Sequence, residues 1–289
     1  MRSIRKIYPA ERVRMGEIML DQPLPARGLD QVDPFLLVHH WEDTLKGGEH
    51  PSQLGVGPHP HRGFTPATFI FKGKLHHRDS TGRSDIVEAG GVQWMNSGRG
   101  IVHSERPPKD LAAEGGDFEI IQFWVNAPAA KKMDAPSYQP LQPKDTPVTR
   151  SEDGKARIDL VAGQFAGKEG QIESHSPLLI LRVDIQAGGK VELPIPQHYN
   201  AFIYQLDGAL TINGKTATKA KDLTLFNNDG PGITIEAVED TRLILLSGEP
   251  INEPVATYGP FVMNSQEEVM QALRDYQMGK MGELVEEFN

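Results

Sequence analysis

The stretch GPHPHRGFTPATFIFKG, residues 57 to 73, joins a pair of histidines to a short apolar run that ends at a glycine. The run from Ala67 to Phe71 is rich in β-branched and aromatic residues, which favours a strand over a helix. Short runs of the same kind recur between glycines, prolines and aspartates: Ile120 to Val125, Leu178 to Ile185, Phe202 to Leu206, Leu223 to Phe226 and Leu243 to Leu246. This pattern predicts an all-β fold made of sandwiches or barrels.

Two parts of the chain match each other in the same order. FIFKG at 69 to 73 aligns with YQLDG at 204 to 208, and GRGIV at 98 to 102 aligns with GPGIT at 230 to 234. Such a repeat predicts a duplicated barrel. A stretch rich in Pro, Asp, Ser and Thr separates the halves and is expected to be a linker. We therefore predict an N-terminal barrel over residues 1–138, a linker over 139–154 and a C-terminal barrel over 155–263.

The last residues, 264–289, depart from the strand pattern and predict a short helical segment. Ser265 and Glu268 form the capping-box pattern of a helix start. An apolar stripe follows at Val269, Leu273 and Tyr276, before glycines weaken the helical pattern. We expect this segment to pack against a barrel.

The composition excludes several classes of site and partner. The 289 residues include no cysteine, so disulfides, zinc-thiolate sites and thiol nucleophiles are ruled out, and any metal must be held by nitrogen and oxygen atoms. The net charge of -9 disfavours a nucleic-acid partner. No apolar run suits a membrane span or a secretory signal. We expect a monomer located in the cytoplasm.

Two motifs carry candidate metal ligands. In a strand, residues two apart face the same side, so His59 and His61 can point into one cavity. His103 and Glu105 repeat this spacing about forty residues later. Each pair alone is a weak signal, but both lie beside glycine-rich turns in barrel-like sequence, where one or two hairpins would bring them together.

The repeat supplies an internal comparison for these four residues. Extending the alignment places the second half's Pro194, Pro196, Ile235 and Ala237 opposite His59, His61, His103 and Glu105, respectively. The ligands are absent together from the second half. We therefore predict one metal-binding N-terminal barrel and a C-terminal barrel that lacks metal ligands.

The donor set narrows the metal without identifying it. Three imidazoles and one carboxylate suit Fe(II), Mn(II), Ni(II), Cu(II) or Zn(II). They do not suit calcium or magnesium, which prefer shells of oxygen atoms. Four ligands leave up to two octahedral positions open, which favours catalysis over a closed structural site.

The chain resembles the pirin family of bicupins over essentially its whole length. The resemblance rests on ordered motifs: GPHPHRGF at 57 to 64, GGVQWMNSGRGIVHSE at 90 to 105, QFWVN at 122 to 126, LPIP at 193 to 196, SGEPINEPV at 247 to 255 and YGPFVMN at 258 to 264. It implies two tandem cupin-type β-barrels and one iron held by His59, His61, His103 and Glu105. The general cupin pattern has a glutamate where Thr65 and Pro66 stand, so Glu105 completes the ligand set by a different route.

The resemblance also implies a function. Pirins are described as quercetin 2,3-dioxygenases, which bind the flavonol through its deprotonated 3-hydroxyl, open the heterocycle with dioxygen and release carbon monoxide. Glu105 would then be the catalytic base as well as a ligand. The alternative is an iron- or redox-sensing regulatory protein that acts by binding a protein partner. A third possibility is a cupin in which the metal only braces the barrel.

Other residues are weaker candidates. We expect His39, His40, His76 and His77 to lie around the site or at the surface, because neighbouring histidines on a strand face opposite sides. Arg62 and Arg99 flank the ligands and suit either an anionic substrate or structural bonds. Gln93, Trp94 and Met95 are expected to line the cavity, with Trp94 and Phe64 equally suited to the core.

Overall fold

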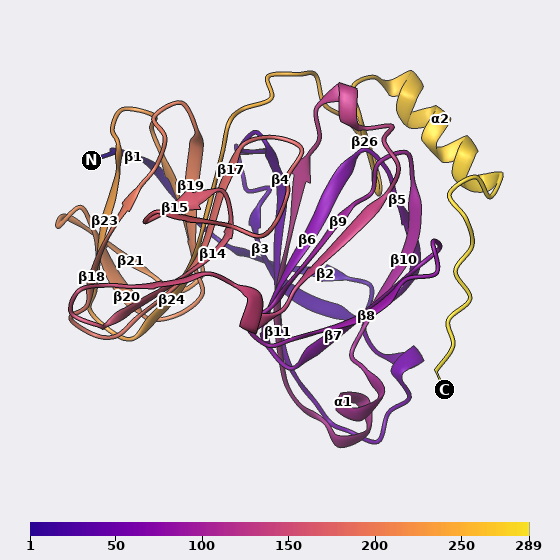
Figure 1. Cartoon of the computed structure of the whole chain (residues 1–289), viewed down its shortest axis with the longest axis horizontal. Coiled ribbons are helices and arrows are strands. Elements are labelled where there is room, and N and C mark those ends of the chain that lie inside the picture. Colours follow the sequence, from indigo (N-terminus) through magenta and orange to yellow (C-terminus); the bar gives the residue numbers. More distant parts are fainter. Residues whose placement is uncertain (289) are drawn as a thin grey trace. The chain divides into compact units, whose positions relative to one another are not determined.

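Antiparallel strands make up most of the chain in the computed structural model, which describes residues 1–288 (Figure 1). The predicted all-β class with a short C-terminal helix is confirmed. The chain forms two compact units, each built from two separate pieces of sequence. Unit 1 comprises Met1–His39 and Asp145–Pro250, and unit 2 comprises His40–Lys144 and the residues from Ile251 onward.

Unit 2 contains a large and a small antiparallel sheet whose inner faces share one interior. The large sheet includes the order β12-β9-β6-β11-β4, and the small sheet has the order β5-β10-β7-β8. The strands are β4 (Phe35–Leu45), β5 (Val56–His61), β6 (Phe64–Lys72), β7 (Lys74–Asp79), β8 (Ser84–Glu88), β9 (Val92–Asn96), β10 (Ile101–Arg106), β11 (Gly116–Asn126), β12 (Ser137–Leu141), β25 (Ala256–Tyr258) and β26 (Phe261–Met263). The helices are α1 (Lys109–Glu114), α2 (Gln266–Gln277), η1 (Pro51–Gln53), η2 (Ala129–Lys131) and η3 (Pro143–Asp145).

Unit 1 has the same plan, with a seven-stranded sheet of order β1-β22-β19-β24-β17-β14-β13 and a four-stranded sheet of order β18-β23-β20-β21. Its strands are β1 (Ile4–Pro9), β2 (Glu11–Met15), β3 (Ile18–Leu24), β13 (Val148–Arg150), β14 (Ala156–Ala162), β15 (Gln164–Phe165), β16 (Lys168–Glu169), β17 (Leu178–Ile185), β18 (Lys190–Pro194), β19 (Asn200–Gln205), β20 (Ala209–Ile212), β21 (Thr216–Lys219), β22 (Asp222–Phe226), β23 (Gly232–Ala237) and β24 (Thr241–Gly248).

The interior of unit 1 is apolar where unit 2 has its candidate ligands. In β18 and β23, Leu193 pairs with Ile233, and Val191 pairs with Ile235. All four side chains belong to one buried hydrophobic cluster. With the repeat aligned at GRGIV and GPGIT, this register places Leu193 and Val191 at the positions of His61 and His59.

The sequence alignment that placed Pro194 and Pro196 opposite the histidines is therefore corrected by the strand register. The physical reason is the turn after each first strand. It is short between β5 and β6, whereas residues 195 to 199 separate β18 from β19. An alignment without a gap consequently slips across this turn.

The ends of the chain do not follow the predicted domain boundaries. β1 pairs with β22, so the first residues complete a sheet of unit 1, although the sequence assigned residues 1–138 to the N-terminal barrel. The predicted linker, residues 139–154, contains the division between the units and also β13, which pairs with β14. Pairing between residues so far apart in sequence leaves no local signal.

The C-terminal segment belongs to unit 2, and α2 begins as the sequence predicts. Ser265 Oγ accepts a hydrogen bond from the Glu268 backbone N–H, and the Glu268 carboxylate accepts one from the Ser265 backbone N–H. Val269 and Ala272 on α2 are buried in a cluster with Phe261 of β26. Within the described residues, neither α-helix combines the length and apolar character needed to cross a bilayer.

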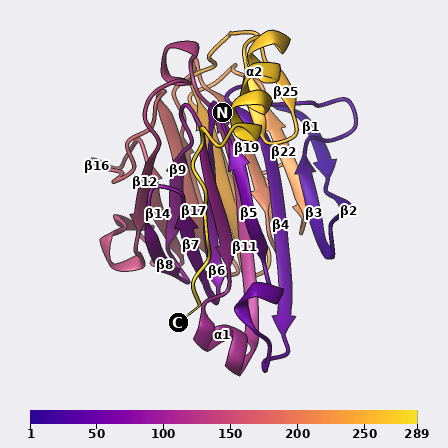
Figure 2. The same ribbon diagram turned by 90° about the vertical axis from the view of Figure 1, so that its right-hand side faces the viewer.

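The residues after α2 run along the outer side of β10, as the yellow segment in Figures 1 and 2 shows. Arg106 donates to both carboxylate oxygens of Glu286, at 2.7 and 2.8 Å. Met281 packs into the cluster that contains Val102, and its carbonyl accepts a hydrogen bond from Ser80. The strand that carries His103 and Glu105 is thus braced from outside by the end of the chain.

Candidate metal centre

Two paired strands bring the predicted histidines together. β5 and β10 are antiparallel, with His103 directly opposite His59 and Ile101 opposite His61. Side chains alternate along each strand, so His59, His61 and His103 all face the interior of unit 2. His61 and His103 are almost fully buried, and His59 is partly buried.

The spacing of the three rings fits a metal ion. One ring nitrogen from each of His59, His61 and His103 lies within 4.8 Å of the others. The Nε2 atoms of His59 and His61 are 3.0 Å apart. Two nitrogens that each lie about 2.1 Å from one ion are separated by roughly 3.0–3.4 Å in octahedral or tetrahedral geometry. The imidazole set therefore matches the donors of a mononuclear transition-metal site.

The hydrogen bonds of the rings leave lone pairs for such an ion. His59 Nδ1 lies 2.8 Å from the carbonyl oxygen of Gly57 and donates its proton there, so Nε2 carries the lone pair. His103 Nε2 is buried and has no hydrogen-bond partner. An unpaired buried nitrogen is costly unless something binds it, which a metal ion would do.

Burial keeps two of the rings neutral. Burial lowers the pKa of His61 well below 6.5, and the neighbouring His59 lowers it further, while the carbonyl of Pro260 acts in the opposite direction. Burial also lowers the pKa of His103 well below 6.5, with added repulsion from His59, His61 and His77. A neutral imidazole is the form that binds metal, so the site is ready for an ion at neutral pH.

We expect the metal-free protein to lose stability as the pH falls below about 6.5. Burial lowers the folded-state pKa of His61 and His103, and that of His39 to about 4, so below pH 6.5 the unfolded chain binds more protons than the folded one. Each such group removes up to about 1.4 kcal/mol per pH unit until its folded pKa is reached. Urea unfolding of metal-free protein between pH 7 and pH 5 measures the slope. His39→Gln should reduce it, and a flat profile would contradict the expectation.

Glu105 lies on the same strand face as His103 but is held by amide groups. Its Oε1 accepts hydrogen bonds from Gln93 and from Thr68, the latter at 3.3 Å, and its Oε2 accepts one from Gln122 at 2.8 Å. Among the described residues, the ligand atoms of His59, His61 and His103 lie within 4.8 Å of one another, and the Glu105 carboxylate does not belong to this group. Glu105 as fourth ligand stays a prediction.

Three polar side chains bind Glu105 in unit 2, and only one of the three corresponding positions in unit 1 has a polar side chain. Thr68 pairs with Gln93 and Gln122 across three strands. The repeat places Ile203, Thr224 and Leu245 at these positions, in the same register. The amide pair is therefore specific to the unit that contains the carboxylate. Sequence analysis identified Gln93 as a lining residue but missed Gln122, which stands four residues before the end of β11.

The other predicted residues divide between structural roles and the site. Arg62 is buried and forms an ion pair with Asp275 of α2 at 2.9 Å, while its Nε donates to the carbonyl of Arg99. It thus fixes α2 rather than facing the interior. Trp94 packs against Phe123 on the opposite strand face from Gln93 and Met95. Met95 joins a small buried cluster with Ile101 and Tyr138.

The four additional histidines also have different surroundings. His39 forms a hydrogen bond with Gln22 in unit 1, and His76 forms one with Ser84 at the surface. His40 is buried beside Glu119 at 3.2 Å, and Lys72 bridges Glu119 to Glu42. These two glutamates and His40 could hold an ion by distance alone, but the Lys72 ammonium already supplies a cation there. His77 approaches the metal centre, and its contacts are described below.

An aromatic pair borders the histidines. The rings of Phe64 and Trp124 have centroids 4.3 Å apart, and both lie close to His61, with centroids at 5.1 and 5.7 Å. Phe64 is buried, whereas Trp124 is partly exposed and its Nε1 donates to Gln122. Sequence analysis missed Trp124, although it follows Gln122 by two residues and therefore shares its strand face.

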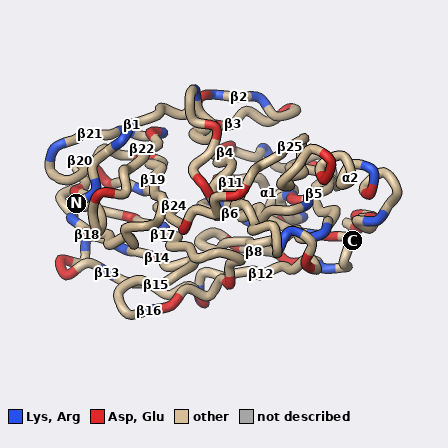
Figure 3. Tube along the Cα trace, turned by 90° about the horizontal axis from the view of Figure 1, so that it is seen from above, with Lys and Arg blue, Asp and Glu red and all other residues tan. Residues whose placement is uncertain are grey.

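Lys and Arg are interspersed with Asp and Glu along the trace in Figure 3, and the sequence carries a net charge of -9.

Comparisons with known proteins agree with this architecture. The family model described as Pirin matches residues 17–125, and the one described as Pirin C-terminal cupin domain matches residues 180–282. A Pseudomonas aeruginosa protein provisionally named quercetin 2,3-dioxygenase PA2418 is 36% identical over 252 residues, covering 86% of each chain. A crystal structure named quercetin 2,3-dioxygenase from Acinetobacter baumannii is 31% identical, with a TM-score of 0.93 over 99% of this chain and 100% of the other. The bacterial pirin YhhW from Escherichia coli, solved with nickel(II), is 20% identical and shares the fold, with a TM-score of 0.67 over 85% of this chain and 98% of the other.

Proposed function

Because this chain belongs to the pirin family of bicupins, we propose that it is a metal-dependent dioxygenase of the quercetin 2,3-dioxygenase type. The observation that carries the proposal is the convergence of three imidazoles, two of them buried with lowered pKa values, on one point of the unit 2 interior. The names of the Pseudomonas and Acinetobacter proteins support the reaction class. The substrates would be dioxygen and a flavonol-like small molecule, and we place the reaction in the cytoplasm.

The proposed ligands are His59, His61, His103 and Glu105. The donor set suits Fe(II) and equally admits Mn, Ni, Cu or Zn, and a nickel-containing relative supports this breadth. We propose iron(II) as the native ion. When bound, the ion supplies Lewis acidity toward the flavonol hydroxyl and a centre at which dioxygen can react.

The protein's own groups supply proton transfer and positioning. Glu105 is proposed to accept the proton of the substrate's 3-hydroxyl, which would leave the flavonol as an anion beside the three histidines. The amide N–H donors of Gln93 and Gln122 limit the positions that this carboxylate can take. The faces of Phe64 and Trp124 are suited to stack on the planar flavonol rings and to orient them.

The test of the proposed base is Glu105→Gln in protein reconstituted anaerobically with Fe(II). A glutamine cannot accept the proton, so we expect kcat to fall by about 100-fold or more, within the range of general-base effects. Dioxygen uptake and quercetin loss measure turnover, and bound iron is measured on the same sample. Glu88→Gln, at an exposed position on β8, is the control. Iron retained with unchanged turnover would exclude Glu105 as the base.

Trp124→Ala is expected to raise KM for the flavonol with little change in kcat. Loss of a stacking face costs about 1–3 kcal/mol of ligand binding, judged from aromatic stacking on planar bases, which corresponds to roughly 5- to 150-fold in KM. Trp41→Ala is a matched control, because Trp41 packs against Phe118 and not against the histidines. Equal effects of the two substitutions would show that Trp124 acts through stability instead.

A second candidate is an iron- or redox-sensing protein that binds a protein partner. One observation favours it: Arg62, next to the ligand His61, forms a buried ion pair with Asp275 on α2. A change of charge at the metal would act on this pair, and α2 also carries the exposed side chains Met270 and Tyr276. Partner capture from cell extract by Fe(II)- and Fe(III)-loaded protein tests this idea. Equal capture in both states would count against it.

A further inference from the structure

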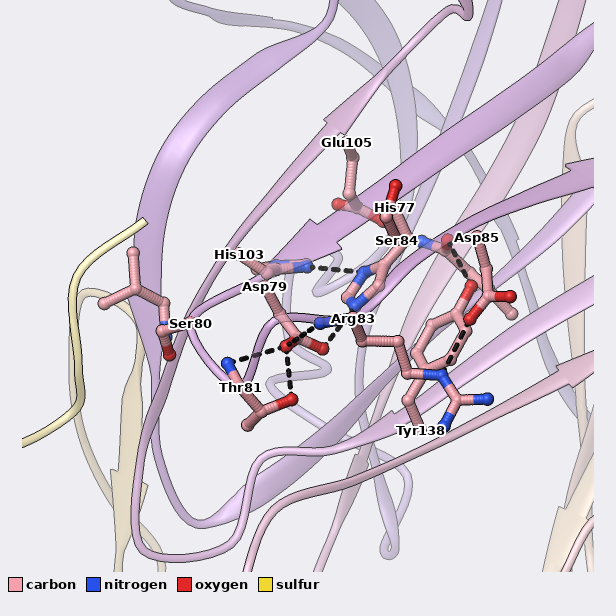
Figure 4. Close-up of polar contacts among 12 residues, drawn as sticks. His77, Asp79, Ser80, Thr81, Arg83, Ser84, Asp85, His103, Glu105 and Tyr138 are labelled. Atoms are coloured by element: carbon pink, nitrogen blue, oxygen red, sulfur yellow. Dashed lines mark hydrogen bonds and ion pairs between the residues drawn. The ribbon is translucent and has the colours of Figure 1, made fainter. Parts of the chain in front are cut away.

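A histidine and an aspartate on β7 lie directly beside the metal-centre strand. β7 pairs with β10, so that Asp79 is opposite His103 and His77 is opposite Glu105. Both β7 side chains are on the interior face and are almost fully buried, with 0% exposure for His77 and 3% for Asp79. In Figure 4, dashed lines join His103 to His77 and His77 to Asp79.

These groups form a chain of hydrogen bonds that ends at His103. Asp79 Oδ2 lies 2.8 Å from His77 Nε2. The other ring nitrogen of His77, Nδ1, lies 3.4 Å from His103 Nδ1. His103 Nε2, on the far side of that ring, is the buried nitrogen without a partner. The chain therefore runs from a carboxylate through two imidazoles toward the proposed ion.

The charge of the Asp79 carboxylate determines which atom donates in each hydrogen bond of this chain. Asp79 Oδ1 accepts the backbone N–H and the hydroxyl of Thr81, at 2.8 and 2.5 Å. Burial raises the pKa of Asp79, but the hydrogen bonds from His77 and Thr81 outweigh it and leave the pKa below its ordinary value. An ionised carboxylate only accepts hydrogen bonds, so His77 Nε2 must donate.

The remaining protons are then determined in turn. With its single proton on Nε2, His77 has a lone pair on Nδ1, which accepts a hydrogen bond from His103 Nδ1. A neutral His103 that carries its proton on Nδ1 has its lone pair on Nε2. That nitrogen is the buried one without a hydrogen-bond partner, so it is free to bind an ion beside His59 and His61.

Tyr138 fixes the plane of the intervening ring. Its ring stacks on His77 with centroids 4.0 Å apart and planes inclined by 12°. The Tyr138 hydroxyl lies 3.4 Å from Gln93 Oε1, so the stacking ring is itself held by the amide that binds Glu105. The His77 ring is thus held at both nitrogens and on one face.

We propose that Asp79 and His77 are positioning residues that hold His103 in its Nδ1-protonated form, with Nε2 aimed at the metal position before any ion binds. The inference rests on the proposed metal site but not on the dioxygenase reaction. Outer partners of metal-binding histidines commonly fix the ring in this way. Here a second histidine stands between the carboxylate and the ligand.

The first test uses the unmodified, metal-free protein. Long-range ¹H–¹⁵N correlation spectra of protein with ¹⁵N-labelled histidine distinguish protonated from unprotonated ring nitrogens, and His103→Gln identifies the His103 signals. We expect His103 to be protonated at Nδ1 and His77 at Nε2. A His103 ring that is protonated at Nε2, or that averages between the two forms, would overturn the proposal without any variant that might misfold.

The second test is Asp79→Asn. The two Thr81 donors should keep the asparagine oxygen at the Oδ1 position, which turns its NH₂ group toward His77 Nε2 and reverses both imidazole protons. We expect zinc(II) affinity, measured by competition with a chelator, to fall by about 10- to 100-fold. The His103 signals should shift to the Nε2-protonated pattern. Asp117→Asn, at an exposed aspartate on β11, should leave both unchanged.

The outcomes separate this inference from the proposed site. No zinc binding by the unmodified protein would overturn the metal site itself. Normal zinc binding by Asp79→Asn, or weakened binding with unchanged His103 signals, would overturn the positioning role and leave the metal site standing. His77→Phe keeps a ring stacked on Tyr138 and removes both hydrogen bonds, so it should reproduce the loss of affinity. His76→Phe, one residue away on the outer face, should not.

Discussion

Loss of all metal-dependent turnover is the expected result of replacing His61 with alanine. His61 is 3% exposed, and its Nε2 atom lies 3.0 Å from that of His59, so alanine removes one of three converging donors. Two imidazoles and a carboxylate would remain. We expect metal affinity to fall by more than about 100-fold, beyond the 10- to 100-fold typical of losing an outer partner.

Three measurements on His61→Ala check this expectation. Bound metal after gel filtration should drop from one ion per chain to a trace, and dioxygen uptake with quercetin should reach the level of metal-free protein. Added metal should raise the Tm of the unmodified protein, since an ion present at 100 times its Kd adds about 2.7 kcal/mol, but should not raise that of the variant. His198→Ala, at an exposed position in unit 1, is the control. Full metal occupancy in His61→Ala would refute the proposed ligand set.

Removing the Asp275 carboxylate is expected to produce a large loss of stability, although the residue lies outside the metal centre. Asp275 accepts a hydrogen bond from Arg62 Nη1 at 2.9 Å, and the two side chains are only 5% and 11% exposed. Asp275→Ala would leave the Arg62 guanidinium buried, with its Nε still donating to the carbonyl of Arg99. Breaking a buried pair by removing one partner costs about 3–5 kcal/mol. We expect a drop of roughly 10 °C in Tm for a unit of this size.

Tryptophan fluorescence isolates this effect. The three tryptophans of the chain, Trp41, Trp94 and Trp124, all lie in unit 2, so their emission during urea unfolding reports on the unit that contains Asp275. Asp110→Ala is a matched control in the same unit, because the Lys74–Asp110 pair is exposed and should contribute little to stability. Equal shifts in the two variants would mean that the Arg62–Asp275 pair contributes no more than a surface pair.

Local patterns in the sequence predicted the parts of the molecule that depend on neighbouring residues. Alternation along a strand was enough to place His59 and His61 on one face, and the spacing of Ser265 and Glu268 was enough to predict the start of α2. The apolar runs predicted strands because runs of four to eight residues between turn signals have the length of strands and are shorter than typical helices.

The parts that depend on pairing between distant strands were not predictable. His77 and Asp79 have the spacing of residues on one face, but only the pairing of β7 with β10 places them behind His103. The same limit applies to Gln122, which reaches Glu105 from another sheet. The assignment of β1 to unit 1 likewise depends on a partner more than 200 residues away. The predictions of an all-β class and of a terminal helix are confirmed, whereas the four-ligand set remains to be tested.

The division of each unit into two pieces of sequence has a consequence for how the protein is made. Apart from Val102, the buried members of the hydrophobic cluster beneath α2 lie beyond residue 250, as do the partners of Arg62 and Arg106. A growing chain therefore carries the histidines of its metal centre long before it carries the segment that braces them. Unit 1 has all its strands once residue 250 is available, so unit 2, which contains the metal centre, is the last to be finished. A ribosome that stops before residues 251 to 288 are made would release a chain with its ligands present and their strands unsupported, and we expect metal loading to follow the synthesis of this segment.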